Sequence, residues 1–166
     1  MRRAIYPGTF DPITNGHLDI LRKATGIFEE VVLAVANVTG KSTFFSFDER
    51  VDICRRCCEG IPNVRVEGFD SLVVDFARKI GAVTMIRGLR AVSDFEYELQ
   101  LALMNRMLDR GLETIFLVPD HNYLYLSSSM VRQIVRLGGS LDDFVPKLVE
   151  ERLHKQFQVV DKPVSV

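Results

Sequence analysis

Residues 6 to 17 read Tyr-Pro-Gly-Thr-Phe-Asp-Pro-Ile-Thr-Asn-Gly-His. This stretch predicts the end of a strand, a turn opened by Gly8, and a helix that begins at about residue 16. The first turn of a helix presents free backbone N–H groups and the positive end of the helix dipole, so a glycine turn that leads into it can bind phosphate. Because His17 lies at that helix start, the predicted phosphate site is also a candidate reaction site.

Short apolar runs alternate with longer helical patterns along the chain. The apolar runs have the character of strands and lie at 4–6, 31–36, 64–66, 83–86 and 115–118. Most are continuous, as in a parallel sheet buried on both faces, whereas the run at 64–66 alternates with polar residues and predicts a more exposed strand. The helical patterns lie at about 16–28, 47–59, 72–79, 94–109, 128–137 and 146–156.

This strict alternation predicts an α/β fold: a Rossmann-like open parallel five-stranded sheet with helices on both faces. The chain has 166 residues and is 47% hydrophobic, which suffices for one core. We therefore expect a single domain over residues 1–158 and a loosely ordered C-terminal tail over 159–166.

Charge and hydropathy exclude several classes of partner. Lys and Arg number 21 against 22 Asp and Glu, and a net charge of -1 gives no general attraction to nucleic acid or to an anionic membrane. We find no apolar run of signal-peptide or membrane-spanning length and expect a cytoplasmic protein.

Cys54, Cys57 and Cys58 form neither a disulfide framework nor a four-ligand zinc site, so we interpret them as reduced, half-buried apolar residues. No carboxylate cluster marks a dedicated metal site.

Ligands of open parallel sheets bind beyond the carboxyl ends of the strands. This rule selects residues 8–17, Lys41, residues 87–90 and residues 119–129. The first of these segments has neither the Gly-x-Gly-x-x-Gly pattern of dinucleotide sites nor the Gly-Lys-Ser/Thr of a P-loop. Each segment also has a purely structural interpretation, because turn glycines, helix caps and surface arginines are common.

Three segments together resemble bacterial phosphopantetheine adenylyltransferases, a family of the nucleotidyltransferase superfamily. They are Pro7 to His17, Arg87-Gly88-Leu89-Arg90 followed by Asp94-Phe95-Glu96-Tyr97-Glu98, and Ser127-Ser128-Ser129. The resemblance spans nearly the whole chain. Where the wider superfamily usually has His-x-Gly-His, this chain has Thr14-Asn15-Gly16-His17, and a threonine there is typical of the phosphopantetheine branch.

The resemblance implies transfer of the adenylyl group of ATP to 4'-phosphopantetheine, which gives dephospho-coenzyme A and pyrophosphate. A phosphate oxygen would attack the α-phosphorus in line, without a covalent enzyme intermediate, so the protein would mainly align the reactants and neutralise charge. Mg²⁺ is expected to be carried with ATP. A homohexamer built as a dimer of trimers is also implied, and residues 95–108 carry two apolar stripes where one core needs only one.

The resemblance also implies roles for individual residues. The catalytic residues would be His17, Lys41 and Arg87, with His17 stabilising the transition state at the α-phosphate. The phosphopantetheine-binding residues would be Thr9, Lys41, Val73 and Arg87. The ATP-binding residues would be Thr9, Phe10, His17, Gly88, Leu89, Arg90, Glu98, Tyr123, Leu124, Tyr125, Leu126, Ser127, Ser128 and Ser129. The sequence leaves open the protonation state of His17 and which tyrosine, Tyr123 or Tyr125, lies beside the adenine.

Two other functions remain open at this stage. A sister enzyme that joins ATP or CTP to another acceptor, such as nicotinamide mononucleotide or glycerol phosphate, would share the fold and His17, although the segment from Arg87 to Glu98 argues against it. A non-catalytic nucleotide-binding protein would share the fold without needing His17 and Lys41 together.

Overall fold

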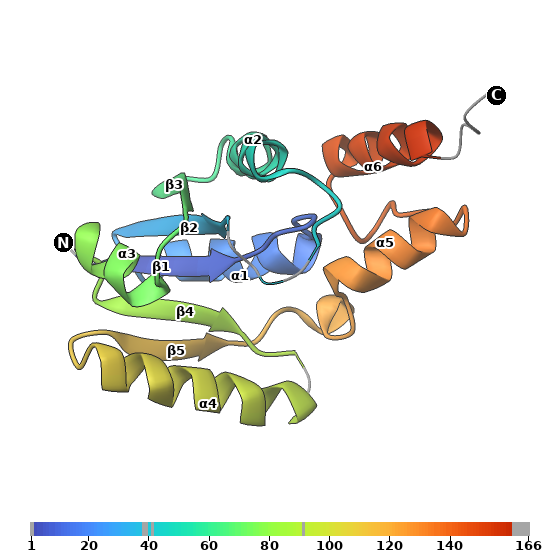
Figure 1. The fold of residues 1–166 in the computed structure, drawn as a ribbon. Coiled ribbons are helices and arrows are strands. Elements are labelled where there is room, and N and C mark those ends of the chain that lie inside the picture. The colour runs from blue at the N-terminus through green and yellow to red at the C-terminus, as the bar shows by residue number, and fades with distance from the viewer. Residues whose placement is uncertain (1, 38–39, 41, 91, 161–166) are drawn as a thin grey trace.

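Strands and helices alternate in the computed structural model, which describes residues 2–37, 40, 42–90 and 92–160 (Figure 1). The strands are β1 (Arg3–Gly8), β2 (Glu30–Ala36), β3 (Val64–Phe69), β4 (Thr84–Gly88) and β5 (Glu113–Leu117). The helices are α1 (Asn15–Thr25), α2 (Phe47–Cys58), α3 (Val73–Lys79), α4 (Val92–Leu108), α5 (Ser128–Arg136) and α6 (Lys147–Val160), with a 3-10 turn η1 (His121–Tyr123) before α5. These elements confirm the predicted order. The predicted tail begins within the last turn of α6, and the rest of it lies outside the described residues.

The five strands form one parallel sheet in the order β3-β2-β1-β4-β5, as the alternating pattern predicted. The chain builds outward from β1 to β3 and then returns to the other side of β1 to add β4 and β5. The order therefore reverses at the junction of β1 and β4, where a doubly wound sheet forms its crevice. β3 lies at an edge and is only partly buried, which confirms the prediction of a more exposed strand.

The crevice opens because β1 and β4 separate toward their carboxyl ends. β1 pairs with β2 along its whole length, from Arg3 to Gly8, but its ladder with β4 holds only Ala4 and Ile5. Pro7 lies in the separated part, and since proline has no N–H, a break in the ladder there leaves no donor unpaired at that residue. The last residues of both central strands therefore flank an opening rather than each other.

Helices cover both faces of the sheet (Figure 1). Tyr6 and Leu33 belong to a large apolar core that includes residues of α1, α2, α5 and α6. Their neighbours Ile5 and Val32 belong to a second core, on the opposite face, that includes residues of α3. This alternation of neighbouring residues between two cores explains why the central strands read as continuous apolar runs in the sequence.

Two buried charges tie the loops at the carboxyl edge together. Asp11 accepts hydrogen bonds from the backbone N–H groups of residues 44–45, at 2.7 and 2.9 Å. Arg50, whose exposed fraction is only 1%, donates from one Nη atom to the carbonyl oxygens of Thr9 and Ala36, at 2.7 Å each. Because buried charges are stable only when they are satisfied in this way, the loop after β1 is fixed against the loop before α2.

The three cysteines of α2 are free thiols, with Cys54 and Cys58 buried and Cys57 partly buried. Burial raises the pKa of Cys57 to about 11 and that of Cys58 to about 12, so both thiols stay protonated and unreactive at neutral pH. This agrees with their interpretation as apolar residues. Within the described residues there is no cluster of three metal-ligating side chains and no helix long and apolar enough to cross a membrane.

Candidate active site

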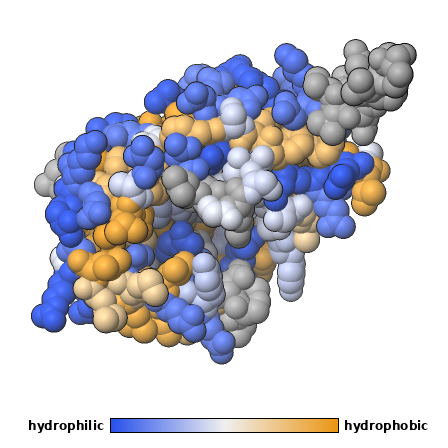
Figure 2. Space-filling model, viewed as in Figure 1, coloured by the Kyte–Doolittle hydropathy of each residue, from blue (hydrophilic) through white to orange (hydrophobic). Residues whose placement is uncertain are grey.

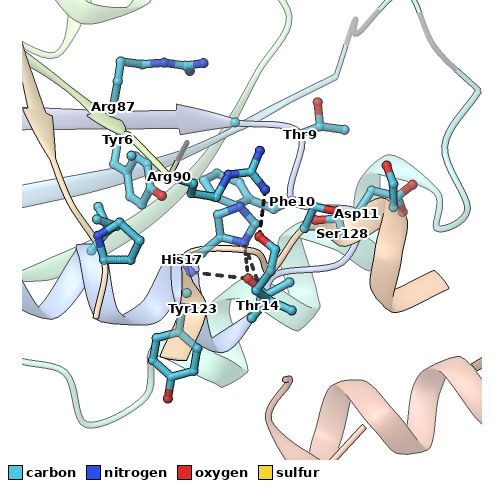
Figure 3. Close-up of a pocket in the computed structure, with 18 of the residues that line it drawn as sticks. Tyr6, Thr9, Phe10, Asp11, Thr14, His17, Arg87, Arg90, Tyr123 and Ser128 are labelled. Carbon is cyan, nitrogen blue, oxygen red and sulfur yellow. Dashed lines mark hydrogen bonds between the residues drawn. The ribbon is translucent and has the colours of Figure 1, made fainter. Parts of the chain in front are cut away.

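A cavity of about 350 Å³ lies beyond the carboxyl ends of β1 and β4 (Figure 3). Residues from the β1–α1 loop, the end of β4, and the start of α5 line it. The predicted site residues that line it are Thr9, Phe10, His17, Arg87, Gly88, Arg90, Glu98, Tyr123, Leu126, Ser127, Ser128 and Ser129. Leu89, Leu124 and Tyr125 do not line it, and Lys41 lies outside the described residues.

Gly8 is needed where the chain leaves β1. A Cβ atom at this position would lie 2.8 Å from Cζ of Phe10, closer than a carbon contact allows. Phe10 itself has a φ of 48°, in the left-handed region that non-glycine residues rarely adopt. The turn thereby folds the Phe10 ring back between Tyr6 and His17, which it meets edge to face at centroid distances of 5.5 and 5.2 Å.

His17 is held at the first turn of α1 by a reciprocal cap with Thr14. The backbone N–H of Thr14 donates to Nδ1 of His17 at 3.0 Å, and the backbone N–H of His17 donates to Oγ1 of Thr14 at 3.4 Å (Figure 3). Since Nδ1 accepts a hydrogen bond, the proton of the neutral imidazole resides on Nε2. Nε2–H is therefore the ring atom that can donate to a ligand.

The surroundings of His17 also oppose its protonation. Burial, and secondarily the positive charges of Arg90 and Arg87, lower the pKa of His17 to about 4. A second proton would in addition have to displace the Thr14 N–H from Nδ1. The imidazole of the free protein is thus neutral at physiological pH, which answers a question that the sequence left open.

We expect His17 to titrate near pH 4 and to show the Nε2–H tautomer, in nitrogen–proton correlation NMR spectra assigned with a His17→Asn variant. The imidazole of the unfolded chain has a pKa of about 6.5, so above that pH His17 is neutral in both states and its contribution to the free energy of unfolding is complete. As the pH falls from about 6.5 to 4, only the unfolded chain takes up the proton, and the free energy of unfolding falls by up to about 1.4 kcal/mol per pH unit. An Nδ1–H tautomer, or titration above pH 6, would contradict the assignment.

Arg87 lies where the two central strands separate. Its guanidinium makes a bidentate ion pair with Glu98 of α4, with Nε–Oε2 and Nη2–Oε1 distances of 2.6 and 2.7 Å. Nη1 donates to the carbonyl oxygen of Pro7 at 3.1 Å, across the gap between β1 and β4. Both carboxylate oxygens of Glu98 are thus engaged by Arg87, which fixes the orientation of the guanidinium beside the cavity.

The start of α5 forms the opposite wall. Ser127 is the N-cap and accepts a hydrogen bond from the N–H of Met130 at 3.1 Å, while the Ser128 hydroxyl donates to the carbonyl oxygen of Pro12 at 2.7 Å. Ser128 thus anchors the helix to the β1–α1 loop. As in any α-helix, the first N–H groups of α5 have no backbone partner within the helix. Arg90 donates to the carbonyl oxygen of Leu126 at 2.7 Å and connects the β4 wall to the same segment.

Several residues that line the cavity were not among the individually predicted site residues. The most polar of them is Arg132, which donates to the backbone carbonyl of Asp11 and lies 3.6 Å from its carboxylate. Helical spacing could have found it, because Arg132 follows Ser129 by three residues and so shares its face of α5. Tyr6 and Asp11 also line the cavity, and both lie in the stretch that first indicated the site.

A second cavity, of about 210 Å³, adjoins the first. Thr9 and Arg87 line both cavities, so the two meet at the ends of β1 and β4. Val73, a predicted site residue, lines the second cavity together with Phe69, Met85 and Asn105. This cavity therefore combines an apolar wall with one side-chain amide.

Comparisons with known proteins agree with this architecture. Residues 5–134 match the cytidylyltransferase-like family. The chain is 51% identical over 158 residues to a phosphopantetheine adenylyltransferase of Thiobacillus denitrificans, covering 95% of this chain and 99% of the relative. It is 53% identical over 157 residues to that of Moorella thermoacetica, covering 95% and 98%. A solved structure of a Plasmodium falciparum nicotinic acid mononucleotide adenylyltransferase, complexed with NaAD, superposes with a TM-score of 0.68 over 96% of both chains at 14% identity, which shows a shared fold.

Proposed function

The chain belongs to the phosphopantetheine adenylyltransferases, within the cytidylyltransferase-like family, and from this premise we propose how its two cavities perform the reaction. The enzyme transfers the adenylyl group of ATP to 4'-phosphopantetheine and releases dephospho-coenzyme A and pyrophosphate. A phosphate oxygen of phosphopantetheine attacks the α-phosphorus of ATP, a new P–O bond forms, and the bond to the β-phosphate breaks. Because the reaction consumes ATP, we propose a cytoplasmic location.

The junction of the two cavities at Thr9 and Arg87 is the observation that carries this proposal. ATP would occupy the larger cavity, with its β- and γ-phosphates toward the N-terminus of α5 and its base toward Tyr123, which lines that cavity. The pantetheine arm is apolar and rich in amides, so it matches the second cavity with Val73 and the Asn105 amide. The two reacting phosphates would then meet at the junction.

The chain's own groups then account for catalysis. Nε2–H of His17 donates to an oxygen of the α-phosphate and strengthens that hydrogen bond as negative charge grows in the transition state. Arg87 and Lys41 hold the attacking phosphate. The cysteines of α2 are protonated and do not line either cavity, so they are not placed to act as nucleophiles on a bound substrate. This supports a direct in-line displacement without a covalent enzyme intermediate.

Mg²⁺ fits this site as an ion carried by the nucleotide. The two carboxylates that line the larger cavity are already committed, Asp11 to backbone N–H groups and Glu98 to Arg87. Mg²⁺ usually keeps several waters and binds through substrate phosphates, and when bound it would offset the charge of the triphosphate. We therefore assign its ligands to ATP and water.

Pyrophosphate release from ATP tests the function, measured with each acceptor in turn. Release with 4'-phosphopantetheine, but not with nicotinamide mononucleotide or glycerol phosphate, supports the proposal. Release with another acceptor would indicate the sister enzyme, and no release with any acceptor would indicate a binding protein. Repeating the assay with EDTA and restored Mg²⁺ tests the metal requirement.

We further propose that the enzyme assembles as a homohexamer, a dimer of trimers, and that α4 lies in an interface. Apolar side chains of α4 remain exposed in the single chain, namely Phe95, Tyr97, Leu99, Leu103, Met104, Met107 and Leu108. Figure 2 shows apolar side chains gathered toward the lower edge of the molecule, where Figure 1 draws α4. An exposed apolar surface of this extent is typical of a surface that another subunit covers.

Met107→Glu is expected to lower the mass of the assembly in sedimentation velocity, because this side chain is 86% exposed in the single chain and a buried carboxylate would oppose association. Leu137→Glu is the matched control, since Leu137 is 78% exposed at the end of α5. It should leave the mass unchanged. A wild-type protein that sediments as a stable monomer would contradict the assembly, and an unaffected Met107→Glu variant would exclude this part of α4 from the interface.

A further inference from the structure

The Tyr6 side chain lies at the wall of the larger cavity, and its hydroxyl has no hydrogen-bond partner among the residues that the structure describes. Tyr6 lies in β1, in the part that has separated from β4, and its exposed fraction is 5%. Its ring packs against Phe10, and Figure 3 shows it among the residues around His17. Among the described residues, none forms a hydrogen bond with its hydroxyl.

The groups around this hydroxyl leave room for an acceptor but do not supply one. A Cβ atom at Gly88 would lie 3.5 Å from the Tyr6 oxygen, so the hydroxyl lies beside the glycine that ends β4. The nearest charges belong to Arg87, Arg90 and Glu98. Arginine cannot accept a hydrogen bond, and the carboxylate of Glu98 is oriented toward Arg87 by two hydrogen bonds and makes none with Tyr6.

The hydroxyl keeps its proton in this environment, because burial raises the pKa of Tyr6 far above the physiological range. It is therefore a neutral donor aimed at a polar cavity. A phenolic donor that lines a substrate cavity and has no hydrogen-bond partner in the described part of the chain is a candidate ligand contact.

We propose that Tyr6 is a nucleotide-binding residue whose hydroxyl donates to an acceptor oxygen of bound ATP, beside Gly88 and Arg90. This inference rests on the proposed function, because it requires ATP in the larger cavity. The acceptor is the 2'- or 3'-hydroxyl oxygen of the ribose or an oxygen of a phosphate, since each of these oxygens accepts a hydrogen bond. Tyr6 thereby adds a contact from β1 itself to those expected from the loops.

Tyr6→Phe removes only this hydroxyl and tests the proposal. We expect the KM for ATP to rise about three- to ten-fold, as for the loss of one hydrogen bond. The KM for 4'-phosphopantetheine and the thermal midpoint should stay unchanged, because the hydroxyl has no partner within the described part of the chain.

Deoxynucleotides distinguish the two acceptors. If the acceptor is the 2'- or the 3'-hydroxyl oxygen of the ribose, the deficit of Tyr6→Phe disappears with the deoxynucleotide that lacks that hydroxyl, 2'-deoxy-ATP or 3'-deoxy-ATP; if it is a phosphate oxygen, the deficit persists with both. An unchanged KM for ATP, or an equal rise for both substrates, would overturn the inference while the wild-type enzyme still turns over. Absence of turnover in the wild type would instead contradict the proposed function.

Discussion

Replacing His17 with Ala should lower kcat by about 10² to 10³-fold while the KM for ATP changes only a few-fold. The variant loses Nε2–H, which the cap by Thr14 fixes as the donor of the neutral ring. A donor aimed at charge that develops in the transition state contributes far more to kcat than to ground-state binding. Steady-state pyrophosphate release, with each substrate varied in turn, measures both constants.

Two further variants make this prediction specific. His17→Gln can still present an N–H group, so it should retain more activity than His17→Ala. His121→Ala removes a histidine that does not line either cavity and should leave kcat unchanged. Turnover by His17→Ala at the wild-type rate would exclude the transition-state role. With a pKa of about 4 in the free enzyme, His17 should also contribute no inflection to kcat/KM between pH 6 and 8.

The fold could be predicted because its local signals agree with each other. Strands such as β2 are continuous apolar runs that serve two cores, and β2 lies in the sequence between the amphipathic helices α1 and α2. The separation of β1 from β4 could not be predicted, since it depends on how many residues of each strand pair. That separation, rather than the glycine turn alone, creates the opening that Arg87 lines.

The site was predicted as contiguous segments, but the structure selects individual side chains from them. In the segment from Tyr123 to Ser129, the 3-10 turn, the turn residues that follow it and the start of α5 leave side chains exposed to different degrees. Tyr123 lines the cavity, whereas Tyr125 is 82% exposed. The tautomer of His17 could not be predicted from the sequence either, because it depends on where the backbone N–H of Thr14 lies relative to the ring.

Arg87 accounts for the second large expected effect. Arg87→Ala should raise the KM for 4'-phosphopantetheine by about 10²-fold, because two charge-assisted hydrogen bonds to a phosphate are worth roughly 3 kcal/mol together. Because Arg87 lies at the junction of the two cavities, we expect Arg87→Ala to raise the KM for ATP as well, but by a smaller factor. Initial rates of pyrophosphate release, measured over a range of each substrate, separate the two. Arg90→Ala is the matched control and should affect ATP instead.

Glu98 makes the cause of that effect measurable. Without Arg87, the carboxylate of Glu98 is left largely buried and would repel the incoming phosphate, so part of the loss in Arg87→Ala is repulsion rather than a missing contact. The double variant Arg87→Ala/Glu98→Gln removes that charge and should recover part of the lost affinity for phosphopantetheine. If Glu98 instead contacts ATP directly, Glu98→Gln alone should raise the KM for ATP. A rise confined to ATP in Arg87→Ala would contradict the assignment of Arg87 to the attacking phosphate.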